Sequence, residues 1–372
     1  MSALADKLYK HVQDYFDLGF HRTGTCVDLS TIKWFEQELL GIGARVERVP
    51  YEYPHYAAEW VLTVDGQEMK SLPLYYEAVG NFEISSPFIG TIDVSGLWPM
   101  GEVIRRQLNA ARSSGADGAV LATSGHEGHL VVPNRAPFLG SGFPALLVAG
   151  TFLERLQQGN VRASLSAEIS ERQSSNVIGY VGEGNFNRPV IVTTPLSGWF
   201  GCAGERGTGI AIAIELARNL AQKYPVIVIG ATGHELEYYG AKKHLETISE
   251  KPAAVIHLGA SVAAGKPGPD NSLVLSPTRH AKTSADGRIA LEIEHALIPG
   301  QFLFESESDR FLGEGGEWIG LEMPLLSFAG GFRLFHAPED VPQNATSPEL
   351  LGVVCRAVVE SSHIFVADAV RG

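Results

Sequence analysis

Apolar residues recur at helical spacing at the start of the chain. Leu4, Leu8, Val12 and Phe16 follow one another every four positions, which predicts an amphipathic helix over residues 1–17. A second helix is predicted to begin at Ser30, a residue type that caps helix N-termini, and to end at the glycines near residue 41. The chain therefore opens with two helices.

The pattern changes to short strand-like runs between residues 58 and 172. Glycine and proline separate these runs, and one helix is predicted over residues 101–114. This stretch is predicted to be a small β-rich domain, inserted between residues 1–57 and 173–372. Its expected strands cover 59–64, 88–94, 118–122 and 144–148.

Strands and helices alternate in the remainder of the chain. The expected strands are continuous apolar runs, which indicates an α/β sheet covered by helices on both faces. A last helix is predicted to begin after Ser347, with a proline in its first turn. The expected strands cover 189–193, 225–230 and 253–258, and the expected helices 209–223 and 235–249.

Composition and charge narrow the classes of function. The 372 residues carry a formal net charge of −13, and no basic cluster interrupts that acidity, so nucleic acid is not an expected partner. No apolar run is long enough to predict a membrane span. Three cysteines are too few for a disulfide framework. We therefore expect a cytoplasmic protein without a membrane partner, and homo-oligomer formation stays open.

Chemistry is expected at the carboxyl ends of the sheet strands. The segments that follow Thr193, Gly230 and Leu258 lie there, and a polar loop over 334–344 precedes the last helix. The first is rich in glycine but lacks the GxGxxG frame of a dinucleotide loop and the GK[ST] of a P-loop. The second contains His234-Glu235, but Tyr238 stands where a zincin HExxH motif needs its second histidine.

Together these segments resemble peptidase family M28, the zinc aminopeptidases, with an inserted protease-associated (PA) domain. The resemblance implies a mixed, mostly parallel central sheet of the zinc-exopeptidase type. It covers nearly the whole chain. The matching stretches are Ser174–Gly179 (SSNVIG), Cys202–Gly209 (CAGERGTG), His234–Ala241 (HELEYYGA), Ser308–Phe311 (SDRF) and Phe335–Asp340 (FHAPED), with Gly115–Val120 and Phe143–Leu146 resembling the PA domain.

The departures from the family pattern are selective. The resemblance implies two zinc ions, but Thr194 and Gly259 stand at two ligand positions of the first, and neither binds zinc usefully. The positions of the second ion hold Glu205, Glu235 and His336, whose side chains can all ligate zinc. One Zn²⁺ is therefore expected. The glutaminyl cyclases of the same superfamily are similar in having one zinc.

His234 stands where the family has its general base. An imidazole accepts a proton near neutral pH, so His234 is the catalytic candidate, although it could equally fill the start of a helix. Arg206 is the main objection to the zinc interpretation, because it could pair with Glu205. Weaker candidates for substrate binding or support of the site are Asp309, Arg310, Thr194, Cys202 and His257.

We therefore expect a single-zinc enzyme acting on an amide or related carbonyl of a small molecule or peptide end, by hydrolysis, cyclisation or amide transfer. Two alternatives stay open. One is a metal-free pseudopeptidase that binds a ligand or serves in an assembly. The other is a metal-free enzyme that uses His234, Cys202 and Glu235.

Overall fold

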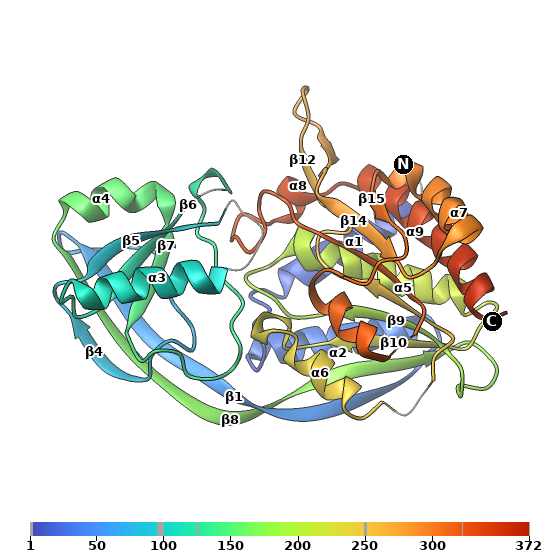
Figure 1. The fold of residues 1–372 in the computed structure, drawn as a ribbon, viewed down its shortest axis with the longest axis horizontal. Helices are drawn as coiled ribbons and strands as arrows, with labels where there is room; N and C mark the ends of the chain where they lie inside the picture. The colour runs from blue at the N-terminus through green and yellow to red at the C-terminus, as the bar shows by residue number, and fades with distance from the viewer. Residues whose placement is uncertain (1–2, 95–99, 125, 249–250, 322, 372) are drawn as a thin grey trace.

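The computed structural model describes residues 3–94, 100–124, 126–248, 251–321 and 323–371. Its main feature is a ten-stranded mixed sheet with helices on both faces, so the predicted fold class is confirmed. The strand order is β15-β14-β16-β11-β9-β10-β8-β1-β2, and β4 also pairs with β8. Figure 1 shows the central strands of this sheet and their helices in the larger of two lobes, which also holds both ends of the chain, whereas β4 lies in the smaller lobe.

Four parallel strands form the centre of the sheet: β16 (Leu325–Gly330), β11 (Ala254–Leu258), β9 (Val190–Pro195) and β10 (Val226–Ala231). Nearly every residue in them is buried. Alternate side chains enter opposite cores, as Val190 and Ile191 do. Burial on both faces is the physical reason for the continuous apolar runs in the sequence.

Helices cover the two faces unequally. One face packs against α1 (Ala3–Asp17), α5 (Thr208–Leu220) and α9 (Pro348–Ala369). The other packs against α6 (Tyr239–Leu245) and the 3-10 helix η6 (Gly313–Leu321). Further elements of this lobe are α2 (Cys26–Gly41), β12 (Gly265–Pro267), β13 (Leu273–Leu275), β14 (Arg279–Thr283), α7 (Gly287–Leu297), η5 (Ile298–Gly300), β15 (Leu303–Glu305) and α8 (Pro342–Ala345).

Two long strands connect the lobes. β1 (Arg45–Val64) and β8 (Val161–Val181) pair in antiparallel register along their whole length and run beneath both lobes in Figure 1. The smaller lobe adds a four-stranded sheet in the order β3-β7-β6-β5. Its elements are β2 (Gln67–Glu68), β3 (Leu72–Pro73), β4 (Gly80–Ile84), β5 (Phe88–Asp93), α3 (Met100–Ser113), β6 (Ala119–Ser124), η1 (His126–Gly128), β7 (Ala145–Ala149), η2 (Gly150–Phe152) and α4 (Leu153–Gln158).

The predicted domain boundaries, 57/58 and 172/173, fall inside β1 and β8. Both strands continue through these positions without interruption. The division into an inserted PA-like domain and an M28-like domain therefore stays a prediction.

Two predicted helices differ in detail from the structure. α2 begins at Cys26, and the Thr25 hydroxyl caps it by accepting from the Asp28 amide, so the predicted start at Ser30 is wrong. The predicted helix 235–249 is broken, because Glu237 and Tyr238 adopt left-handed backbone conformations between a short 3-10 turn and α6. The last helix begins as predicted, with Ser347 as its N-cap.

Helix α9 is long and apolar enough to cross a membrane by length and composition alone. However, 56% of its most apolar window is buried inside the protein, where it packs against α1, α5 and α7. A buried core helix has the same properties, so this is weak evidence for a span.

Candidate active site

The candidate site is built around a single π turn at the carboxyl end of the central strands. This turn, η3 (Ala203–Gly207), precedes α5. The buried Asp340 carboxylate accepts hydrogen bonds from the amides of Gly204 (2.7 Å) and Glu205 (3.0 Å), which ties the loop before α8 to the turn. π turns are frequent at functional sites because they redirect side chains locally. Here the turn directs Glu205 and Arg206 inward.

Glu205 and Arg206 form a fully buried ion pair. Arg206 Nη2 lies 2.7 Å from Glu205 Oε1, and both side chains have 0% exposure. Arg206 Nε donates to the Ser197 carbonyl at 3.1 Å. Burial alone would raise the pKa of Glu205, but His336 and Arg206 outweigh it and lower this pKa to about 2. Glu205 is therefore a carboxylate already neutralised by a guanidinium.

His336 lies on the other side of Glu205. Its Nε2 is 3.2 Å from Glu205 Oε1, and its amide donates to Glu205 Oε2 at 3.1 Å. Its Nδ1 is 2.8 Å from the carbonyl oxygen of Val132. The backbone of His336 is left-handed (φ 58°), a conformation held here by these contacts on both sides.

Both carboxylate oxygens of Glu235 already accept hydrogen bonds. Oε1 accepts from the Thr23 amide and Oε2 from the Ser197 hydroxyl, each at 2.7 Å. The turn that brings Thr23 here requires the following glycine, since a Cβ on Gly24 would lie 1.7 Å from the Tyr53 hydroxyl oxygen. Glu235 thus joins the first loop of the chain to the site.

The contacts of Glu205, Glu235 and His336 do not fit the binding of a zinc ion by these three side chains. Among the residues that the structure describes, no three His, Cys, Asp or Glu side chains lie together as a group able to hold a metal. Glu205 is paired with a guanidinium, and Glu235 is hydrogen-bonded at both oxygens. A dication would have to displace the fixed positive charge of Arg206. The zinc roles of Glu205, Glu235 and His336 therefore stay predictions that this geometry does not support.

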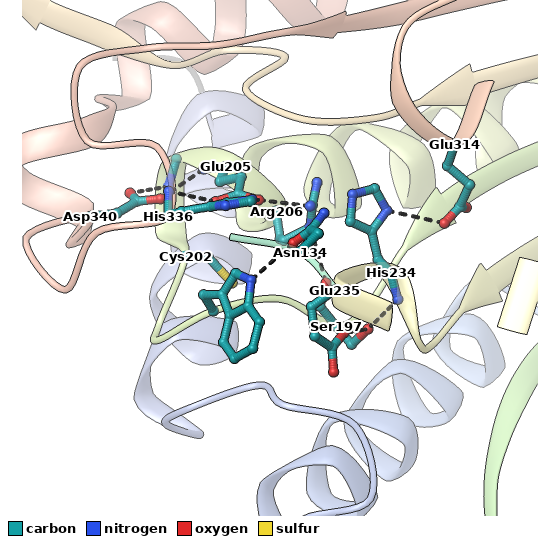
Figure 2. Close-up of polar contacts among 12 residues, drawn as sticks. Asn134, Ser197, Cys202, Glu205, Arg206, His234, Glu235, Glu314, His336 and Asp340 are labelled. Carbon is teal, nitrogen blue, oxygen red and sulfur yellow. Dashed lines mark hydrogen bonds and ion pairs between the residues drawn. The ribbon is translucent and has the colours of Figure 1, made fainter. Parts of the chain in front are cut away.

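His234 makes a second polar pair beside Arg206. Its Nδ1 is 3.1 Å from Glu314 Oε2, and its amide donates to the Ser197 hydroxyl. Burial lowers the pKa of His234 well below its usual value, and the charge of Arg206 adds to this effect. Burial also raises the pKa of Glu314 to about 8. Figure 2 shows Arg206 between the Glu205–His336 pair and the His234–Glu314 pair.

The weaker candidates divide into buried and exposed residues. Thr194 donates from its hydroxyl to the Leu258 carbonyl at 2.8 Å, which is a structural contact between strand ends. Cys202 is buried against the Tyr15 hydroxyl, and burial raises the pKa of its thiol far above the usual value, so it is not a thiolate nucleophile at neutral pH. His257 is buried near the site. Asp309 and Arg310 are exposed residues outside the buried cluster.

A segment of the smaller lobe covers the site. We call residues 130–136 the cover segment. Val132 donates to the His336 carbonyl, Arg135 donates from its amide to the Glu235 carbonyl at 2.9 Å, and Asn134 accepts from the Trp199 indole at 2.9 Å. Both lobes therefore contribute to the site.

Sequence reasoning gave no role to Glu314 or Ser197. Glu314 belongs to η6, far along the chain, and the family motifs give no signal for it. Ser197 lies within the segment 194–209, and the only available signal was its place shortly after a buried strand. Asp340 was matched as part of a motif, but its role in holding the π turn required the fold.

Comparison of the sequence with protein-family models and with curated proteins finds no match. Solved structures do match. A zinc aminopeptidase from Bacillus subtilis, BSAP, superimposes with a TM-score of 0.74 at 16% identity, over 96% of this chain and 94% of that chain. This chain has an M28-like fold. The family resemblance deduced from the motifs is confirmed at the level of fold.

Two further solved structures also superimpose on this chain. A peptidase M28 precursor from Shewanella amazonensis gives a TM-score of 0.71 at 17% identity, over 97% of this chain and 96% of that chain. A glutaminyl cyclase from Porphyromonas gingivalis gives 0.52 at 14% identity, over 99% of each chain. At such identities the likeness concerns the fold, and the chemistry must be argued from this chain's own residues.

Proposed function

We propose that this protein is a metal-independent enzyme with an M28-like fold, acting on an amide or related carbonyl of a small molecule or peptide end. In this proposal Arg206 supplies the positive charge that polarises the carbonyl, and His234 transfers the proton. The observation that carries it is the position of Arg206. Its guanidinium is fully buried beside His234, and Nη1 has no hydrogen-bond partner among the described residues.

The electrostatics support this role for Arg206. Burial would lower the pKa of its guanidinium, but Glu205 outweighs burial and raises that pKa, so the charge is permanent. A fixed donor in a water-poor site stabilises a developing oxyanion without reorganising, and such donors are worth roughly 3–4 kcal/mol in other enzymes. The hydrogen bond from Nε to the Ser197 carbonyl and the Glu205 contact hold the guanidinium in place.

His234 has the properties of a proton acceptor. Its lowered pKa keeps the imidazole neutral at pH 7, and in the tautomer whose Nδ1–H donates to Glu314 Oε2, Nε2 is free of hydrogen and can accept a proton. In hydrolysis, water oxygen bonds to the carbonyl carbon while its proton passes to His234 Nε2. The carbonyl π electrons move to the oxygen that Arg206 holds. Their return breaks the C–N bond, and the amine leaves with the proton from His234.

The test is turnover in the presence of a chelator. Protein made without a histidine tag is screened against N-acylated aminoacyl anilides, with and without EDTA. We expect turnover that EDTA does not change, that His234→Gln abolishes, and that Arg206→Lys lowers about 100-fold or more. Arg218→Lys, a change in an i,i+3 pair on α5 far from the reaction, is the matched control. Turnover that stops with EDTA and returns with zinc would overturn the proposal.

A further inference from the structure

Three polar side chains form a row across the central strands. In the parallel register, His257 on β11 is paired with Thr193 on β9 and with Ser327 on β16. Residues paired in this way point to the same face of a sheet. All three are at most 2% exposed. We call these residues the polar row.

The polar row has no hydrogen-bond partner within the described protein. This holds for Thr193 Oγ1, for both ring nitrogens of His257 and for Ser327 Oγ. Leaving a buried polar group unpaired costs about 1–3 kcal/mol, and nearly all such groups in native proteins are paired. Adjacent unpaired groups on three neighbouring strands therefore indicate a site for a polar occupant.

Helix η6 connects the polar row to the candidate active site. Glu314 Oε1 is also buried and unpartnered, while its Oε2 contacts His234. The next residue, Gly315, lies against the row: a Cβ there would be 2.6 Å from Ser327 Oγ and 3.0 Å from His257 Cδ2. Because the backbone of Gly315 lies so close to Ser327 and His257, the polar row can bind only a small group.

The surroundings of the polar row carry no net charge. Arg206 and Glu205 form an ion pair whose opposite charges sum to zero. Burial, with the charge of Arg206, lowers the pKa of His257 to about 3, so its imidazole is neutral. Glu314 is mostly protonated at pH 7, because burial raises its pKa to about 8. A charged group entering this space would lose its hydration, and the nearby Arg206 guanidinium is already paired with Glu205.

We propose that the polar row binds an uncharged, hydrogen-bonding end of the substrate, of the carboxamide class, and rejects free amino and carboxylate ends. A neutral imidazole offers one donor and one acceptor, and each hydroxyl offers either. A carboxamide presents the complementary donors and acceptor within a few atoms. This inference rests on the proposed function, since it makes the row part of the same site as His234 and Arg206.

The experiment uses acetamide, acetate and methylammonium as small probes of matched size. Each is titrated at constant ionic strength into ¹⁵N-labelled full-length protein at pH 7, and the His257 imidazole signals, assigned with His257→Gln, are followed by NMR. We expect a saturable shift with acetamide and none with the two ions. Because binding is measured without turnover, acetamide binding can be absent while the proposed enzyme activity is present. It can equally be present while that activity is absent, so the two proposals fail separately.

Two variants make the test specific. Ser327→Ala should weaken acetamide binding about fivefold, the loss of one hydrogen bond. Ser362→Ala is the matched control, because Ser362 is equally buried and its hydroxyl is equally unpartnered, but it lies on α9. An acetate shift as large as that of acetamide would overturn the proposal. So would the absence of any shift with all three probes, which would show a row that holds water only.

Discussion

Arg206 lies directly against Glu205, with Nη2 and Oε1 2.7 Å apart and no exposure of either side chain. In the zinc interpretation of the sequence, Glu205 would be a metal ligand. In the structure its charge is balanced by the neighbouring residue along the chain. This pairing makes a positive charge a permanent part of the site, and the proposed polarisation of the substrate carbonyl depends on that charge.

Breaking this pair should destabilise the fold strongly. Arg206→Met leaves the Glu205 carboxylate buried without its guanidinium, and we expect a loss of about 3–5 kcal/mol in the free energy of unfolding. The double variant Glu205→Gln/Arg206→Met should recover most of that loss. Urea unfolding measures both. Arg288→Met, in a pair whose arginine side chain is 88% exposed, should change stability by less than about 1 kcal/mol. Equal losses in the single and double variants would contradict the pairing.

Stability should depend on pH through Asp28. Burial raises the pKa of Asp28 to about 7, from 3.8. The folded state therefore binds its proton more tightly than the unfolded chain does, and the resulting stability is complete below pH 3.8 and is lost as pH rises through 7. The total is about 4 kcal/mol. Asp28→Asn should remove this component, so that the difference in unfolding free energy between variant and wild type grows from pH 4 to 7. A constant difference across that range would refute it.

Helix α2 offers a direct test of cap position. Thr25→Ala removes the hydroxyl that accepts from the Asp28 amide and should cost about 1 kcal/mol. Ser30→Ala, at the position that the sequence pattern favoured, should cost little, since Ser30 lies in the helix and is exposed. Thermal unfolding of the two variants decides between the positions. A larger loss for Ser30→Ala would restore the sequence-based start.

The success and failure of the sequence interpretation have physical causes. The central strands were predictable because burial on both faces leaves continuous apolar runs, as in Val226–Ala231. The break after Leu236 was not predictable, because the left-handed backbone at Glu237 and Tyr238 depends on tertiary contacts rather than on local preference. The Glu205–Arg206 pair was foreseen only as an objection, since adjacent residues do not normally face the same way. The π turn makes them do so.

The cover segment should open more easily than the sheet beneath it. The amides of Val132 and Arg135 donate to the carbonyls of His336 and Glu235 in the larger lobe, whereas the amide of Val120 lies within β6. We expect a ligand to reach the buried groups by breaking these contacts. Hydrogen exchange followed by mass spectrometry should show faster exchange at residues 132–135 than at 119–123. Equal protection of both would argue against entry at this face.

Zinc content tests the central claim most directly. Untagged wild-type protein is incubated with excess zinc, exchanged into metal-free buffer and measured by mass spectrometry of the metal, alongside His336→Ala. The account predicts zinc far below one ion per chain in both proteins, because Arg206 already supplies the charge beside Glu205. One zinc per chain in the wild type, lost in His336→Ala, would contradict it and support the metal site that the sequence suggested.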